Sequence, residues 1–260
     1  MNRARVGIVV VALCSGLGVV ACGGDEEPRQ VDPEALLDTA FSHPVNSAVT
    51  RIELAAGADA VPALSVPVMI SLDGPYVSGG GVRLPSADWD LEAEVAGFGI
   101  EGELVSTGDN VYLSVFGDNY QLGRAAIVAR REALSEPGLD PRSWFGPAAY
   151  EGDEEVEGTA TARIDAPLRG AQLAADLEEF GGRLGLPPVR PPSERGTIQA
   201  WIGIDDGIVR ELRIDAGEDL AADVVLSNVG EPREITIPAG GGFKPIGDLL
   251  SSLQELGVSP

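Results

Sequence analysis

The chain has 260 residues, and its 41 acidic residues outnumber 18 basic ones, which gives a formal net charge of −23. A nucleic acid is excluded as a natural partner, because phosphate binding requires a basic surface. His43 is the only histidine, so a catalytic triad would have to use that one imidazole; we expect it to be solvated or to cap a helix. The length suits a single domain with a sizeable aliphatic core.

Residues 1–21 have the layout of a secretory signal peptide, with a basic start and an apolar stretch from residue 6 onward. This stretch is too short and too rich in glycine for a transmembrane helix, which needs about 20 apolar residues. The segment Val19-Val20-Ala21-Cys22 matches the lipobox of bacterial lipoproteins. We therefore expect acyl chains on the Cys22 sulfur, which would anchor the protein to the outer face of the bacterial cell membrane.

Cleavage before Cys22 also removes Cys14, so the mature chain keeps one cysteine. No disulfide and no thiolate-based zinc site is expected. We divide the chain into a signal peptide (1–21), a lipidated N-terminus with a flexible tether (22–33) and one folded domain (34–260).

The folded domain is predicted to begin with a helix. Asp32-Pro33-Glu34 supplies an N-cap, a proline and an acid for the first turn, and an apolar stripe continues to Phe41. From residue 46 to 123, apolar residues alternate with polar and acidic ones, and Gly, Asp and Asn mark the turns. This pattern predicts an antiparallel meander with a wet acidic face and an apolar face.

The second half is predicted to mix helices and strands. Helical patterns cover 124–134, a short turn at 140–144, residues 169–184 and a C-terminal segment at 246–256. An acidic run at 151–157 leads into a strand at 156–164, and 186–193 is an extended proline-rich link. Further strands are expected at 198–204, 212–214 and 220–226. The fold class is therefore α+β: a curved antiparallel sheet with helices packed on its apolar face.

Acidic clusters are weak candidates for a metal or catalytic site. The acids at 88–94 are spaced along one straight strand, whereas hard cations draw oxygens from several loops, so a solvated outer face is the better interpretation. Asp205-Asp206-Gly207 lacks further ligands and is a turn, and Trp89, Trp144 and Trp201 are expected in the core. We expect no catalytic residues, no metal and no cofactor. An enzyme would require two carboxyl groups that face each other in a cleft.

Two segments carry a family resemblance. Residues 151–168 read EGDEEVEGTATARIDAPL, and residues 201–238 read WIGIDDGIVRELRIDAGEDLAADVVLSNVGEPREITIP. Together with Cys22, they resemble the LppX/LprA/LprF/LprG lipoproteins of actinobacterial envelopes, most clearly over 150–238. The resemblance implies a half-barrel like those of the LolA and LolB carriers, with a cavity for acyl chains of lipids or lipoglycans.

The expected ligand is thus a lipid or lipoglycan, held on the apolar side of the sheet in a single lipid-binding domain. An envelope transporter is a further expected partner, and Cys22 supplies the membrane attachment. The alternative is a solid-cored scaffold or transporter-accessory lipoprotein without a cavity. The cavity candidates are alternating apolar residues of the clearest strands: Leu104, Val111, Leu113, Ile198, Ile202, Leu212, Val224 and Leu226. The apolar stripe of a helix that either forms a lid or belongs to the core consists of Leu173, Leu177, Phe180 and Leu184.

Overall fold

The computed structural model describes residues 31–58, 60, 66–79, 84–95, 97–123, 127, 139–184, 196–238 and 242–249. The contacts divide the chain into two compact units, Met1–Gln30 and Val31–Pro260, and all the described residues belong to the second unit. The predicted signal peptide, Cys22 and most of the predicted tether therefore lie outside the described residues. So do nearly all of the predicted helix at 124–134, the link at 186–193 and the end of the predicted C-terminal helix.

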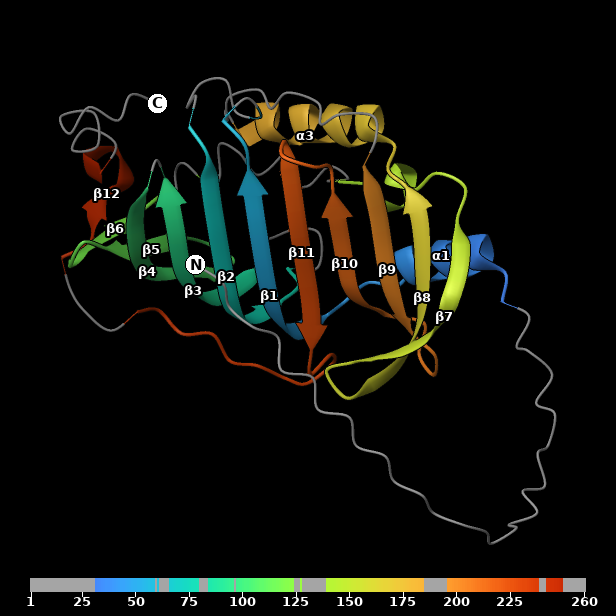
Figure 1. Ribbon diagram of the computed structural model, residues 1–260. Helices are drawn as coiled ribbons and strands as arrows, with labels where there is room; N and C mark the ends of the chain where they lie inside the picture. The colour runs from blue at the N-terminus through green and yellow to red at the C-terminus, as the bar shows by residue number, and fades with distance from the viewer. Residues whose placement is uncertain are drawn as a thin grey trace, which may run out of the picture. The chain divides into compact units, whose positions relative to one another are not determined.

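The described strands form one open, curved sheet of twelve strands (Figure 1). Its order is β12-β6-β5-β4-β3-β2-β1-β11-β10-β9-β8-β7, and each pair is antiparallel except β12 with β6. The strands are β1 (Ser47–Ala56), β2 (Val68–Val77), β3 (Ser86–Val95), β4 (Phe98–Thr107), β5 (Val111–Val115), β6 (Asp118–Gln121), β7 (Ala149–Val156), β8 (Thr159–Pro167), β9 (Thr197–Gly203), β10 (Val209–Asp215), β11 (Leu220–Ser227) and β12 (Lys244–Pro245).

Residues 246–249, at the start of the predicted C-terminal helix, are helical. Three further helical segments accompany the sheet within the described ranges: α1 (Pro33–Ser42), the 3-10 turn η1 (Pro141–Trp144) and α3 (Gly170–Leu184). They pack on the concave, apolar face, so the predicted α+β fold class is confirmed. None of the described helices is long and apolar enough to cross a bilayer.

The predicted start of α1 is confirmed by its cap. The Asp32 carboxylate accepts hydrogen bonds from the backbone N–H groups of Glu34 at 3.1 Å and Ala35 at 3.2 Å. These N–H groups have no partner inside the helix, so the cap fixes where α1 begins. At the other end, the His43 ring bonds the Thr39 carbonyl through Nδ1 at 2.8 Å, which confirms its capping role.

The acidic run at 151–157 departs from the prediction. The prediction placed this run in a loop before a strand, but most of it forms strand β7 itself. The chain then turns at Glu157 and Gly158, which both have positive φ, and continues into β8. β7 is the last strand of the sheet. Charged side chains are common on such an edge because they oppose pairing with another chain, so acidity there is compatible with a strand.

One glycine allows two neighbouring strands to approach closely. Gly74 of β2 has φ +152°, and a Cβ placed there would lie 2.0 Å from the carbonyl oxygen of Asp88 in β3. Any other residue would separate the strands at the point where Trp89 reaches across the sheet. The Trp89 indole N–H donates to Thr50 Oγ of β1 at 2.8 Å.

Candidate functional site

An apolar strip crosses the concave face of the sheet, which we call the inner face. The pairing registers place Leu212, Val224, Ile52, Leu72 and Leu91 directly opposite one another on successive strands. All five side chains are only half-buried. Their sequence neighbours point to the other side, the outer face, which carries most of the charges.

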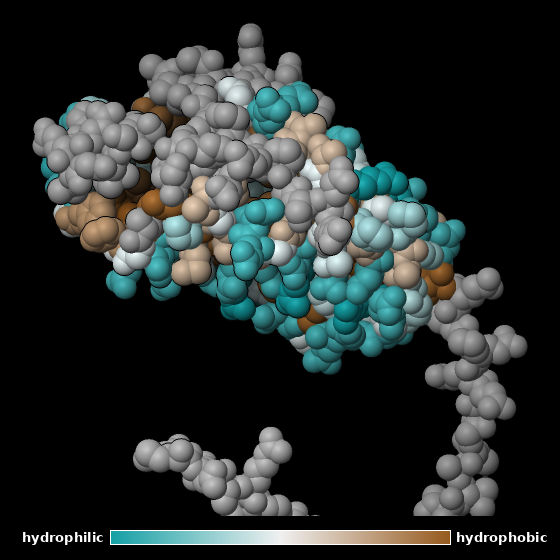
Figure 2. All heavy atoms as spheres, turned by 45° about the horizontal axis from the view of Figure 1, so that its top comes forward, coloured by the Kyte–Doolittle hydropathy of each residue, from teal (hydrophilic) through white to brown (hydrophobic). Residues whose placement is uncertain are grey.

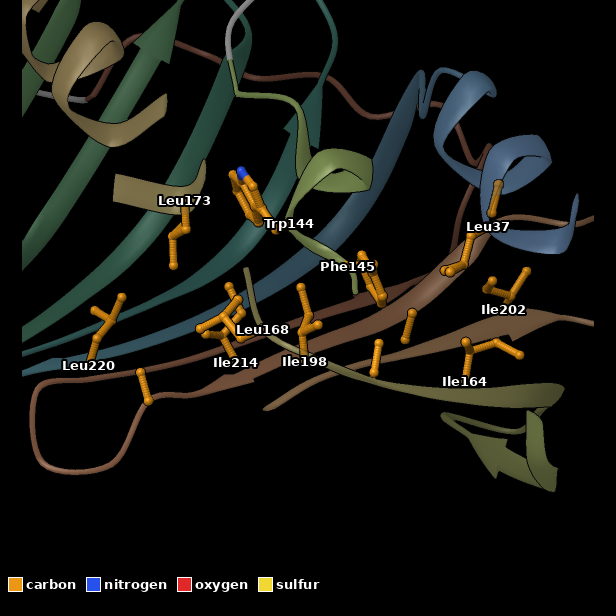
Figure 3. Packing of buried hydrophobic residues seen from close by; sticks show 14 residues of the cluster. Leu37, Trp144, Phe145, Ile164, Leu168, Leu173, Ile198, Ile202, Ile214 and Leu220 are labelled. Carbon is orange, nitrogen blue, oxygen red and sulfur yellow. The ribbon is translucent and has the colours of Figure 1, made fainter. Parts of the chain in front are cut away.

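One end of the inner face is filled by protein. Leu37 of α1, Phe145 beside η1 and Leu173 of α3 pack onto β8, β9 and β10 (Figure 3). Ile198 and Ile202, two of the predicted cavity residues, are fully buried there. They belong to the buried core cluster beneath the helices.

Next to this core, the inner face holds a groove of about 210 Å³, which we call the inner groove. One wall consists of α1 and the segment after it, and the other consists of β10 and β11. Three of the predicted residues line it: Leu212, Val224 and Leu226. The remaining lining residues are Ala40, Phe41, His43, Val45 and Val209. A mostly aliphatic groove of this kind suits a hydrocarbon chain.

The remaining cavity candidates lie further along the same face. Leu104 of β4 is paired with Leu113 of β5, and Val111 stands two positions before Leu113. All three are half-buried, and Leu113 packs against a small buried cluster of Val115, Tyr120 and Leu249. The structure thus places them with the apolar strip but outside the inner groove.

The predicted lid stripe on α3 is anchored at its N-terminal end. Leu173 is buried in the core and Leu177 packs against it, while Phe180 is half-buried. Asp176 accepts the indole N–H of Trp144 at 2.7 Å, which ties the helix to η1. The side chain of Leu184 lies outside the described residues. Movement of α3 stays a prediction.

The charges gather on the outer face. Asp90, Glu92 and Glu94 of β3 are exposed there, which confirms the solvated acidic face. Figure 2 shows hydrophilic residues over most of the described surface in its view, with hydrophobic residues confined to patches. Burial and the nearby Asp88 raise the pKa of Glu103 on this face. Among the described residues, no group of three or more His, Cys, Asp or Glu side chains is arranged to hold a metal ion.

Part of the inner face was not predicted from the sequence. Phe41, Val45 and Val209 line the inner groove, and Ile52 and Leu54 of β1 lie in the apolar strip or beside it. For the β1 residues a signal existed, because they alternate with Arg51 and Glu53. The residues near α1 had no such signal, since only the folded chain brings α1 against β10 and β11.

An open sheet that curves around an aliphatic strip, with helices filling one end and a groove beside them, defines a half-barrel fold.

No protein-family model matches the sequence, and no curated protein matches it. Among solved structures, LprF from Mycobacterium bovis is similar, with a TM-score of 0.55 and 17% identity, covering 80% of this chain and 97% of that one. LppX from Mycobacterium tuberculosis aligns with a TM-score of 0.47 and 16% identity, covering 78% and 98% of the two chains. The likeness to LprF confirms the predicted resemblance at the level of the fold.

Proposed function

We propose that this protein is a membrane-anchored envelope lipoprotein that binds acyl chains of lipids or lipoglycans on its inner face and carries or presents them. Acyl chains on Cys22 anchor it to the outer face of the cell membrane, and an envelope transporter is a partner in the hand-over. The activity is binding and transfer, without a chemical step.

The observation that carries this proposal is the inner groove. Its walls are formed by Phe41, Val209, Leu212, Val224 and Leu226, and it adjoins half-buried aliphatic side chains on β1 and β2. A continuous strip of partly exposed apolar side chains over several strands is typical of a surface that binds an apolar ligand. The resemblance of residues 151–168 and 201–238 to the LppX/LprA/LprF/LprG lipoproteins implies the same class of ligand, and the lipobox at 19–22 fits a protein attached to the envelope membrane.

The energetics suit a carrier. Each methylene moved from water into an apolar groove gains about 0.8 kcal/mol. A chain that leaves a bilayer starts in an equally apolar solvent, so most of that gain cancels. The groove therefore exchanges chains with a membrane at little net cost and opposes their escape into water.

The test is native mass spectrometry of the body without residues 1–22, produced in a bacterial host. We expect bound lipid in the wild-type protein and its loss in Val224→Lys, because the ammonium group would have to enter an aliphatic groove. Val225→Lys is the matched control, because Val225 is the next residue of β11 and faces the other side. Absence of lipid from repeated wild-type preparations, or equal losses in both variants at equal unfolding midpoints, refutes the proposal.

The filled end of the inner face favours a second candidate. Ile164, Ile198 and Ile202 are fully buried beneath the helices, as in a solid-cored scaffold or transporter-accessory lipoprotein. In that case the inner groove would stay empty, and the same mass spectra would contain only the protein.

A further inference from the structure

The outer face carries a second groove, on the side of the sheet opposite to the inner groove. The hairpin joining β7 and β8 reaches over this face, and its tip residues Glu155, Val156 and Glu157 form one wall. The floor is formed by β1, β10 and β11. The volume of this open groove is about 330 Å³. We call this the outer groove; its remaining lining residues are Arg51, Glu53, Glu211, Arg213, Asp223 and Val225.

Acidic side chains outnumber basic ones in the outer groove, five to two. The Arg213 guanidinium pairs with Glu211 at 2.6 Å and Asp223 at 2.9 Å. The Arg51 guanidinium pairs with Glu157 at 3.7 Å across the groove and with Asp73 of β2 at 3.0 Å. These two arginines cannot neutralise all the carboxylates, so the groove keeps a net negative charge.

One acceptor in the outer groove lacks a donor. The Oδ1 atom of Asp223 is buried and has no hydrogen-bond partner among the described residues. Glu211 beside it is only 9% exposed. Burial and the nearby Asp223 raise the pKa of Glu211, so two carboxyl groups share a poorly solvated space. A buried acceptor without a partner costs free energy that an added N–H donor recovers.

The outer groove continues into a more apolar hollow of about 310 Å³. The two share Glu53, Arg213 and Asp223, and the hollow adds Ala55, Met69 and Ala221 from neighbouring strands. Met69 is 50% exposed. Small and apolar residues therefore line the hollow directly beside the carboxylates of the outer groove. Lysine and arginine side chains have this form, because an aliphatic stem carries a cationic end.

We propose that the outer groove docks a basic segment of a partner protein, with a lysine or arginine stem over Ala55, Met69 and Ala221 and its cation among Glu53, Glu155 and Asp223. Charge complementarity selects this occupant. The excess of carboxylates repels nucleic acids and anionic lipid headgroups. Because the two grooves lie on opposite faces of the sheet, a partner can dock while the inner groove is occupied.

The first test uses fluorescence anisotropy to measure the binding of a labelled peptide of lysine, alanine and serine to the protein without residues 1–22. The double variant Glu53→Gln/Glu155→Gln removes two groove charges while keeping side-chain size. The control Glu92→Gln/Glu94→Gln removes the same charge from β3 on the same face. We expect the groove variant to weaken binding about tenfold and the control to weaken it less than about twofold. Equal weakening, or no binding to the wild-type protein at low ionic strength, overturns the proposal.

The second test uses Met69, which is the only methionine besides Met1. The bound peptide should slow the oxidation of Met69 by hydrogen peroxide, because its stem covers the hollow, and the Glu53→Gln/Glu155→Gln variant should lose this protection. Unchanged oxidation overturns the proposal. Displacement of the peptide by spermidine or calcium at matched charge concentration also overturns it, because the groove would then be a site for small cations.

Discussion

Ile52 of β1 and Val224 of β11 are direct cross-strand partners on the inner face of the sheet. This pair joins the half of the sheet that contains β1–β6 and β12 to the half that contains β7–β11, and Val224 also lines the inner groove. The groove therefore lies beside the junction of the two halves, between the filled end and the half-buried aliphatic strip.

Large-to-small substitutions should distinguish the filled end from the inner groove. Ile198→Ala should lower the free energy of unfolding by about 2–5 kcal/mol, because it leaves a cavity in close packing. Leu226→Ala should lower it by less than about 1.5 kcal/mol, because Leu226 already borders open space. Urea unfolding of the lipid-free body measures both. Similar losses for the two variants would mean that the groove is as closely packed as the core.

The N-cap of α1 should contribute measurably to stability. Asp32→Ala removes the acceptor for two backbone N–H groups and should cost about 1 kcal/mol. Thermal unfolding checks this, with Asp90→Ala, an exposed strand residue, as the control. If the two variants unfold at the same temperature, the cap contributes nothing.

Arg163 should make stability sensitive to acid. Its guanidinium bonds Asp165 at 2.8 Å and Glu154 at 3.1 Å, and it lies 5.5 Å from the Trp201 ring. Hydrogen bonds from Trp201 and Arg163 lower the pKa of Glu154. Burial alone would raise the pKa of Asp165, but hydrogen bonds from Arg163 and Gln199 outweigh it and lower that pKa as well.

A carboxyl group whose pKa is lower in the folded than in the unfolded state stabilises the fold above the unfolded value of about 4. That contribution is lost as the pH falls through the folded value. Arg163→Met should therefore be destabilised at neutral pH and lose less stability on acidification than the wild type. Urea midpoints across this range measure the difference, with Arg233→Met, which breaks the Arg233–Glu231 pair, as the control. Parallel pH curves would contradict the assignment.

Glu211→Gln should have the opposite pH dependence. Burial and Asp223 raise the pKa of Glu211, so its ionised form is disfavoured in the folded state. The variant should be more stable than the wild type at neutral pH, and this advantage should disappear as the pH falls and the wild-type carboxyl takes up a proton. Chemical unfolding at several pH values tests this. A variant that is less stable throughout would mean that the Arg213 pair outweighs the cost of burial.

Local signals in the sequence predict much of this fold. The start of α1 follows from one capping residue, and strands β3, β4 and β9 follow from alternation between apolar and polar residues. These signals act between residues close in the sequence, so the chain displays them before it folds. The acidic β7 lacked such a signal because it is an edge strand with few apolar residues.

The site was harder to predict for a physical reason. Ile198 and Leu212 both belong to alternating apolar patterns and both face inward, yet one is buried under the helices and the other lines the inner groove. The difference depends on where α1, η1 and α3 pack, which alternation does not encode. The stacking of Trp201 between Arg163 and Arg213 on the outer face likewise requires strands β8, β9 and β10 to be in register.

The junction between β1 and β11 also has a consequence for how the chain folds. During synthesis β1 is made early and β11 late. The backbone N–H and C=O groups of β1 that pair with β11 therefore lack this partner until almost the whole domain has been made. Contacts between such distant segments slow folding, and an open strand edge invites pairing with other chains. Arg51 and Glu53 keep the outer side of β1 charged, which opposes pairing of β1 with another chain before β11 is made.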